Sequence, residues 1–186
     1  MGQSNSRYSI KLKKNIKLSY CKQNKIILKD HLGDINLISF LKNNNGLINN
    51  LIEFLLQKIG YSIKLNISDP YNERMINYFS KISINNDITI DYSLYYSSLD
   101  TIYYFLSKYQ ILIGVIVMDS TFLSEIVQIN YIVNNIVSDI VLIIGYSQES
   151  IIIQTNWTTE SIEIPNKFIN NFKELWNVNV KGPDNC

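Results

Sequence analysis

Few residues in this chain could carry cysteine-based nucleophilic catalysis. The sequence contains two cysteines, Cys21 and Cys186, and a single histidine, His31. Because a thiol becomes a strong nucleophile when a neighbouring imidazole takes its proton, Cys21 and His31 are the only candidate Cys–His pair near each other in the chain. A surface or packing role explains His31 more simply. With so few cysteines and histidines, we expect no disulfide framework, no metal site and no cofactor.

A carboxylate and a hydroxyl form a second candidate pair. Asp139 begins one apolar stretch, and Thr155 and Asn156 follow the next one. A carboxylate of ordinary pKa is too weak a base to activate a hydroxyl at neutral pH unless burial raises that pKa strongly. The simpler role of Asp139 is that of a strand-entry residue or cap. An active hydrolase or transferase that uses these three residues stays as an alternative.

The N-terminal residues match a pattern for membrane attachment. Gly2 followed by Ser6 fits N-myristoylation, in which the glycine amine is acylated after Met1 is removed. One myristoyl chain binds membranes only marginally, and a basic cluster can supply the second signal for stable anchoring. The basic residues expected to contact the membrane are Arg7, Lys11, Lys13, Lys14 and Lys17. We expect the arm to bind the inner leaflet or an internal membrane surface on the cytoplasmic face, or the virion membrane if the protein is viral; the alternative is an ordinary polar arm on a soluble protein.

Composition indicates a folded chain and excludes several classes of protein. The 186 residues are 46% hydrophobic and 18% charged, which allows one substantial core. The formal net charge of +1 gives no electrostatic case for a nucleic-acid partner. The apolar run at 111–118 is too short to span a bilayer, and the polar first residues predict no secretion signal. The excess of Ile, Asn, Tyr and Lys fits an AT-rich genome, such as that of a large DNA virus or an AT-rich microbe.

Apolar periodicity predicts one helix in the first half of the chain and one that interrupts the strand region that follows. Residues 47–59 place their leucines and isoleucines on one face, and Gly60 supplies the stop. Residues 99–108 form a second predicted helix, with a serine or Asp100 near its N-cap. Residues 71–79 fit either a short helix or an ordered loop.

β-Branched runs predict strands in the second half. The candidate strands are 111–118, 139–146, 151–157 and 161–164. A short helix over 167–176 is expected to close the chain. Helices followed by strands indicate an α+β fold.

Several of these stretches, in the same order, resemble the papain-like cysteine peptidases. Leu51-Ile-Glu-Phe-Leu55 resembles the latter half of the family's central helix. Asp139 to Tyr146 resembles the strand "His-Ala-Val-x-x-x-Gly-Tyr", and Thr155-Asn-Trp157 resembles "Asn-Ser-Trp". The resemblance covers residues 26–178. It implies a two-lobed fold in which a helical lobe precedes an antiparallel β-barrel lobe, with a groove between them.

The resemblance also implies that the chemical positions of the family are replaced. The nucleophile position falls on Asn43 or Asn44, the histidine position on Asp139 and the orienting asparagine position on Thr155. No cysteine occurs in residues 22–185, and no glutamine in residues 24–56 could act as the usual oxyanion donor. We therefore expect no peptidase activity.

These observations divide the chain into three parts. Residues 1–25 form the basic arm, 26–180 the papain-like domain and 181–186 a tail. The main hypothesis is a catalytically inactive papain-like protein that is bound to a membrane and acts as a structural or interaction component with a protein partner. If the source is a large DNA virus, a component of the virion or virus factory is the natural expectation. The alternatives are the hydrolase described above and a soluble peptide-binding module.

Overall fold

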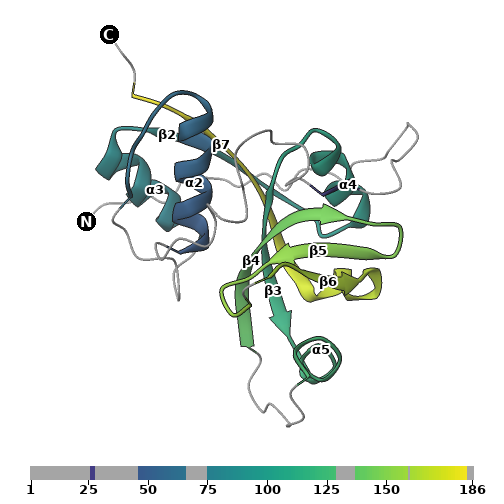
Figure 1. Ribbon diagram of the computed structural model, residues 1–186. Helices are drawn as coiled ribbons and strands as arrows, with labels where there is room; N and C mark the ends of the chain where they lie inside the picture. The colour runs from purple at the N-terminus through teal and green to yellow at the C-terminus, as the bar shows by residue number, and fades with distance from the viewer. Residues whose placement is uncertain (1–25, 28–45, 66–74, 129–136, 159, 184–186) are drawn as a thin grey trace.

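A computed structural model of the chain describes residues 26–27, 46–65, 75–128, 137–158 and 160–183. In chain order the elements are β1 (Ile26–Ile27), α2 (Leu47–Lys58), α3 (Met75–Asn86), β2 (Thr89–Tyr95), α4 (Leu99–Ser107), β3 (Leu112–Met118), α5 (Ser120–Phe122) with a π-helical turn (Leu123–Val127), β4 (Val137–Tyr146), β5 (Ser150–Gln154), β6 (Ile162–Pro165), a 3-10 helix (Asn166–Asn171) and β7 (Phe172–Lys181). Helices α2 and α3 lie together on one side, and strands β3 to β6 lie on the other (Figure 1). The fold is α+β, as the order of the sequence patterns predicts.

One antiparallel sheet joins the two sides. Its strand order is β2-β7-β3-β4-β5-β6, and β1 pairs with β4. The long strand β7 pairs with β3 through its first half and with β2 along most of its length, so it runs from the sheet to the helices (Figure 1). The expected closed barrel is wrong: in the described part of the chain the sheet is open, with β2 and β6 at its two ends. Strand β7 carries β2 toward the helices and away from β6.

Helix α2 confirms the predicted helix at 47–59. Its apolar residues form a buried face, and Gly60, at a φ of +94°, ends it in the left-handed conformation that glycine tolerates best. Two asparagines in its first turn, Asn49 and Asn50, are fully buried, which the apolar pattern does not predict. The hydroxyl of the buried Tyr78 in α3 donates a hydrogen bond to Oδ1 of Asn49, so the two helices share a polar contact inside the core.

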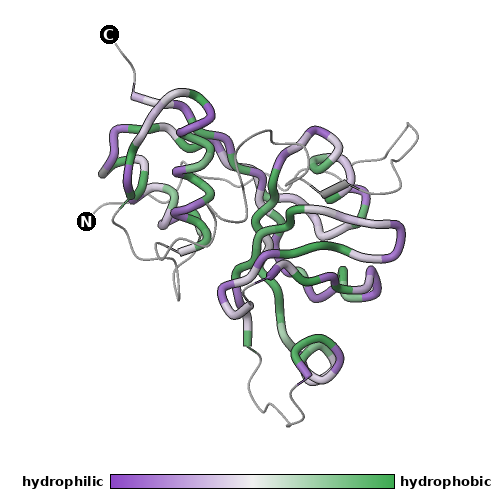
Figure 2. The backbone as a smooth tube through the Cα atoms, in the orientation of Figure 1, coloured by the Kyte–Doolittle hydropathy of each residue, from purple (hydrophilic) through white to green (hydrophobic). Residues whose placement is uncertain are grey.

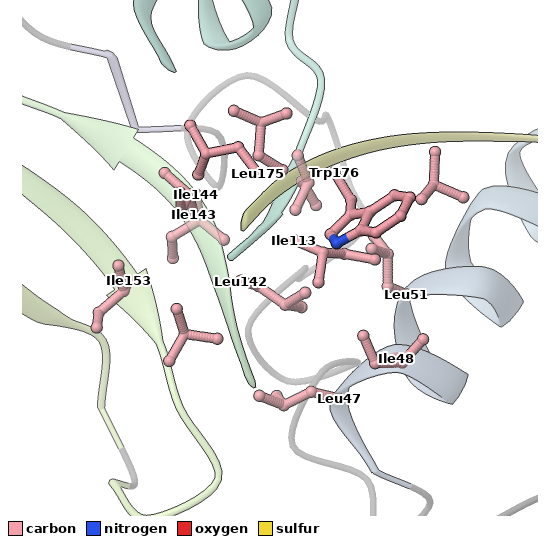
Figure 3. Close-up of a cluster of buried hydrophobic side chains, with 14 of the residues drawn as sticks. Leu47, Ile48, Leu51, Ile113, Leu142, Ile143, Ile144, Ile153, Leu175 and Trp176 are labelled. Carbon is pink, nitrogen blue, oxygen red and sulfur yellow. The ribbon is translucent and has the colours of Figure 1, made fainter. Parts of the chain in front are cut away.

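The buried face of α2 packs against the sheet. Leu47, Ile48 and Leu51 point toward Leu142 of β4, Ile113 of β3 and Trp176 of β7 (Figure 3). All six side chains are almost completely buried. The central strands are correspondingly hydrophobic along their length, whereas the turns that connect them are mostly hydrophilic (Figure 2). The space between the helices and the sheet at this level is therefore filled core.

Three sequence predictions need correction. The expected helix at 167–176 is wrong: a 3-10 helix ends at Asn171, and Phe172 begins β7. The strand expected over 151–157 ends at Gln154. The helix considered at 71–79 is α3, which extends to Asn86. Helix α4 and strands β3, β4 and β6 agree with the predictions to within one or two residues at each end, and Ser98 is the N-cap of α4.

Candidate functional site

Asp139 lies near the start of β4, opposite Ile116 of β3. It is half-buried, and its Oδ1 accepts a hydrogen bond from the backbone N–H of Ile140 at 2.8 Å. The side chain of Trp157, whose only donor is the indole N–H, also hydrogen-bonds to the carboxylate. Burial raises the pKa of Asp139 above 3.8, and the two hydrogen bonds oppose that shift. Asp139 is thus a partly buried carboxylate that interacts with the backbone of Ile140 and the side chain of Trp157.

Thr155 and Trp157 belong to a turn that follows β5. The Thr155 hydroxyl accepts the backbone N–H of Thr158 at 3.0 Å, and the two threonine hydroxyls are 2.6 Å apart. This side-chain turn competes with strand pairing and explains why β5 ends at Gln154. Asn156, also expected near the site, is exposed in the same turn. Because Trp157 belongs to this turn, its side chain lies beside Asp139.

In the described part of the chain, the structure does not bring the sequence-predicted residues Asp139, Thr155 and Asn156 together as a hydrogen-bonded set. Asp139 meets Trp157, but among the described residues the Thr155 hydroxyl bonds within its own turn and has no hydrogen bond to Asp139. A base must lie within hydrogen-bond reach of the proton that it takes, and no such hydrogen bond joins the Asp139 carboxylate to Thr155 in the described part of the chain. Among the described residues, the site therefore holds a partly buried carboxylate that is not paired with the predicted hydroxyl.

Gln154 is a neighbour of this site that sequence reasoning missed. Its side chain is 1% exposed, and its Nε2 donates to the carbonyl of Thr155 at 3.2 Å. Its Oε1 is buried with no hydrogen-bond partner in the described part of the chain. The signal in the sequence is a single amide at the end of the isoleucine run Ile151-Ile-Ile153, where a fully apolar residue would be the usual choice.

Several predicted site residues lie outside the described residues. These are Gly2, Arg7, Lys11, Lys13, Lys14, Lys17, Cys21, His31, Asn43 and Asn44. The description of α2 begins at Gly46, which provides no side-chain cap, and continues with the buried Leu47. The positions assigned to the nucleophile and to the membrane arm therefore stay predictions.

Neither of two hollows on the described surface is lined by Asp139, Thr155 or Trp157. One, of about 440 Å³, lies between Tyr96, Ser97 and the start of β7. The other, of about 420 Å³, lies beside the C-terminal ends of α2 and α4. In the described ranges no group of three or more His, Cys, Asp or Glu side chains could hold a metal ion. No described helix is long and apolar enough to cross a membrane.

Ionisation of Asp139 predicts a measurable pH dependence. Because the folded protein holds this proton more tightly than the unfolded chain, the charged carboxylate costs stability. The cost is absent below pH 3.8, where Asp139 is protonated in both states, and grows as the pH rises toward the raised folded-state pKa. The difference in free energy of unfolding between Asp139→Asn and the wild type should therefore increase with pH over this window, measured by urea denaturation. A difference that stays flat or decreases as the pH rises would contradict a carboxylate whose pKa is raised by burial.

Comparison with known proteins gives one structural likeness. No family model matches the chain, and no curated protein matches its sequence. The crystal structure of xylellain, a cysteine protease from Xylella fastidiosa, superposes with a TM-score of 0.45 at 12% identity, covering 86% of this chain and 87% of that one.

Proposed function

We propose that the chain is a papain-like domain without peptidase activity that acts as an interaction component. The proposal rests on the residue that stands at the position assigned by the sequence resemblance to the catalytic histidine, and on what that residue contacts. An aspartate stands there, and it accepts hydrogen bonds from its neighbour's backbone and from Trp157. A carboxylate fixed in this way can neither form an ion pair with a thiolate nor shuttle a proton as imidazole does.

The arrangement of elements supports the same proposal. An amphipathic helix, α2, precedes an antiparallel sheet and packs its buried face against β3, β4 and β7 (Figure 3). The side chain of Trp157, from the turn after β5, interacts with Asp139 near the start of β4, so the two segments that carry the resemblance lie together. The hydrolase alternative is less favoured, because in the described part of the chain no hydrogen bond joins the Thr155 hydroxyl to the Asp139 carboxylate that would have to take its proton.

The experiment that tests the proposal is turnover of a pooled set of fluorogenic peptides by the wild-type protein and by Asp139→Ala. We expect the wild type to release no more fluorophore than a buffer control, and the variant to behave identically. Turnover by the wild type that Asp139→Ala abolishes would establish the hydrolase alternative. Turnover that is unchanged in Asp139→Ala but is lost when Cys21 is replaced would indicate a cysteine-dependent activity and overturn the proposal.

Membrane attachment is a separate part of the proposal, and its support is the sequence of the arm. Gly2 and Ser6 fit the acylation pattern, and the basic residues that follow supply a second membrane signal. When the full chain is expressed in eukaryotic cells with a clickable myristate analogue, we expect the wild type to be labelled and Gly2→Ala to be unlabelled. An unlabelled wild type would leave the soluble interaction module as the function.

A further inference from the structure

The groove beside the ends of α2 and α4 has the features of a peptide-binding site. It has a volume of about 420 Å³, within the range of about 300–1,000 Å³ that ligand sites occupy. Lys58 and Ile59 line it from α2, Lys108 and Tyr109 from the end of α4, and residues 178–180 from β7. Neither Asp139 nor Trp157 lines it, so the inference below does not depend on the proposed lack of peptidase activity.

An open stretch of strand edge lies in this groove. Pairing between β7 and β3 reaches its last pair at Asn177 and Leu112. Beyond it, in the described part of the chain, Val178 to Lys181 pair with β2 alone. Ile111, the residue just before β3, lines the groove together with Val178 and Val180, which places the open edge at the groove. An extended peptide can add as a strand to such an edge through main-chain hydrogen bonds.

Tyr109 stands beside this edge in a conformation that suits a glycine. Helices α2 and α4 end with the same pattern, in which the residue after the left-handed position donates its N–H to a carbonyl of the last turn at 3.0 Å. After α2 the left-handed residue is Gly60, but after α4 it is Tyr109, at a φ of +58°. A side chain at that φ is disfavoured, and Tyr109 is 45% exposed, so core burial does not offset the cost. A strained, exposed aromatic residue that lines a groove is suited to contact a ligand.

The charge of the groove indicates the chemistry of the ligand. Its lining includes two lysines, Lys58 and Lys108, and no aspartate or glutamate. A lysine in the last turn of a helix is favoured by the helix dipole, so either lysine alone would indicate little. Here the two lysines come from the ends of different helices and line one groove of mixed polar and apolar character beside an open strand edge. Carboxylates on a ligand would complement them.

We propose that this groove binds an extended, acidic segment of a partner protein, which adds as a strand to the edge of β7 at residues 178–181. Its apolar residues contact Ile59, Ile111 and Tyr109. Its carboxylates lie near Lys58 and Lys108.

The test uses a fluorescein-labelled peptide, acetyl-Asp-Glu-Val-Ile-Val-Glu-Asp-amide, and fluorescence anisotropy with the full-length protein. We expect saturable binding that Lys58→Glu/Lys108→Glu weakens by about tenfold or more. Lys64→Glu/Lys173→Glu makes the same change in net charge at exposed positions outside the groove, and it should leave the affinity unchanged. Alternate N-methylation of the peptide backbone should abolish binding, because it removes donors for strand addition.

Tyr109→Gly separates a binding role from a structural one. It should raise the urea midpoint by relieving the left-handed conformation, and it should weaken peptide binding several-fold. A wild type that does not bind the peptide saturably overturns the proposal, as does equal weakening by the two lysine pairs. Unchanged binding of the N-methylated peptide also overturns it. If the peptide does not bind but the protein forms a dimer that Lys58→Glu/Lys108→Glu disrupts, the groove binds a second copy of the chain instead. If the peptide does not bind but the protein binds vesicles containing phosphatidylserine, and Lys58→Glu/Lys108→Glu abolishes that binding, the groove binds a lipid surface instead.

Discussion

Replacing Trp176 with alanine is expected to lower the free energy of unfolding by about 3–5 kcal/mol. The indole is 2% exposed and lies where the helices meet the sheet, facing the buried side of α2 (Figure 3). Its ring meets those of Phe79 and Tyr92 edge-on, each with 5.9 Å between ring centroids. Its Nε1 donates to Oε2 of Glu174 at 2.7 Å. Truncation therefore leaves a cavity at the junction of α3, β2 and β7 and removes two aromatic contacts.

Urea denaturation of the variant and of Tyr96→Ala measures this effect. Tyr96 is an aromatic residue that is 51% exposed, and its replacement should change the free energy of unfolding by about 0.5 kcal/mol or less. Similar losses in the two variants would mean that Trp176 does not join the helices to the sheet.

The second large effect is expected from Gly114→Ala in β3, which should cost about 1–3 kcal/mol. A Cβ at this position would lie 2.8 Å from both Cδ1 and Cε1 of Phe172, on the neighbouring strand. The Phe172 ring is 2% exposed, and the Ser97 hydroxyl donates to its backbone carbonyl at 2.6 Å, which limits how far the residue can shift. The steric cost should therefore exceed the gain of about 0.4–1 kcal/mol from restricting the unfolded chain.

A double-mutant cycle with Phe172→Leu tests the cause directly. Leucine removes the ring atoms that the new methyl group would meet, so Gly114→Ala should cost less in the Phe172→Leu background than in the wild type. Additive losses would place the strain of Gly114→Ala elsewhere in β3.

Local sequence signals were sufficient to predict helices α2 and α4. In α2, leucines and isoleucines at helical spacing are followed by Gly60, and the helix ends there. Ser98 caps α4 by accepting the N–H of Thr101 at 3.1 Å. In both helices the sequence pattern and the packing agree, so the predictions hold.

Non-local pairing explains the elements that were predicted wrongly. Phe172 to Trp176 mixes charged and aromatic residues, which suits a short helix in isolation. It is a strand because β3 pairs with it on one side, and β2 pairs with Leu175 and Trp176 on the other. The open sheet has the same origin: the barrel expected from the resemblance cannot close while β7 extends beyond β3 toward the helices. Such tertiary effects override local propensity.

At the candidate site, sequence reasoning identified the segments but not their bonding. It aligned Asp139 and Thr155 through the resemblance, and the turn after β5 does reach the start of β4. It did not predict that Trp157 would be the partner of Asp139, because the Thr155–Thr158 turn that aims the indole depends on side-chain hydrogen bonds. The buried amides of Gln154 and Asn49 likewise look like surface residues in the sequence.

The central claim, that this chain assembles no thiolate–imidazole pair, is tested most directly by the ionisation of the Cys21 thiol. The measurement is the rate of alkylation of Cys21 by iodoacetamide as a function of pH, in a Cys186→Ser background with and without His31→Ala. We predict that the Cys21 thiol behaves as an isolated thiol, with a pKa of about 8.5 that His31→Ala leaves unchanged. A thiol pKa several units lower that reverts in His31→Ala would reveal an ion pair and contradict the account.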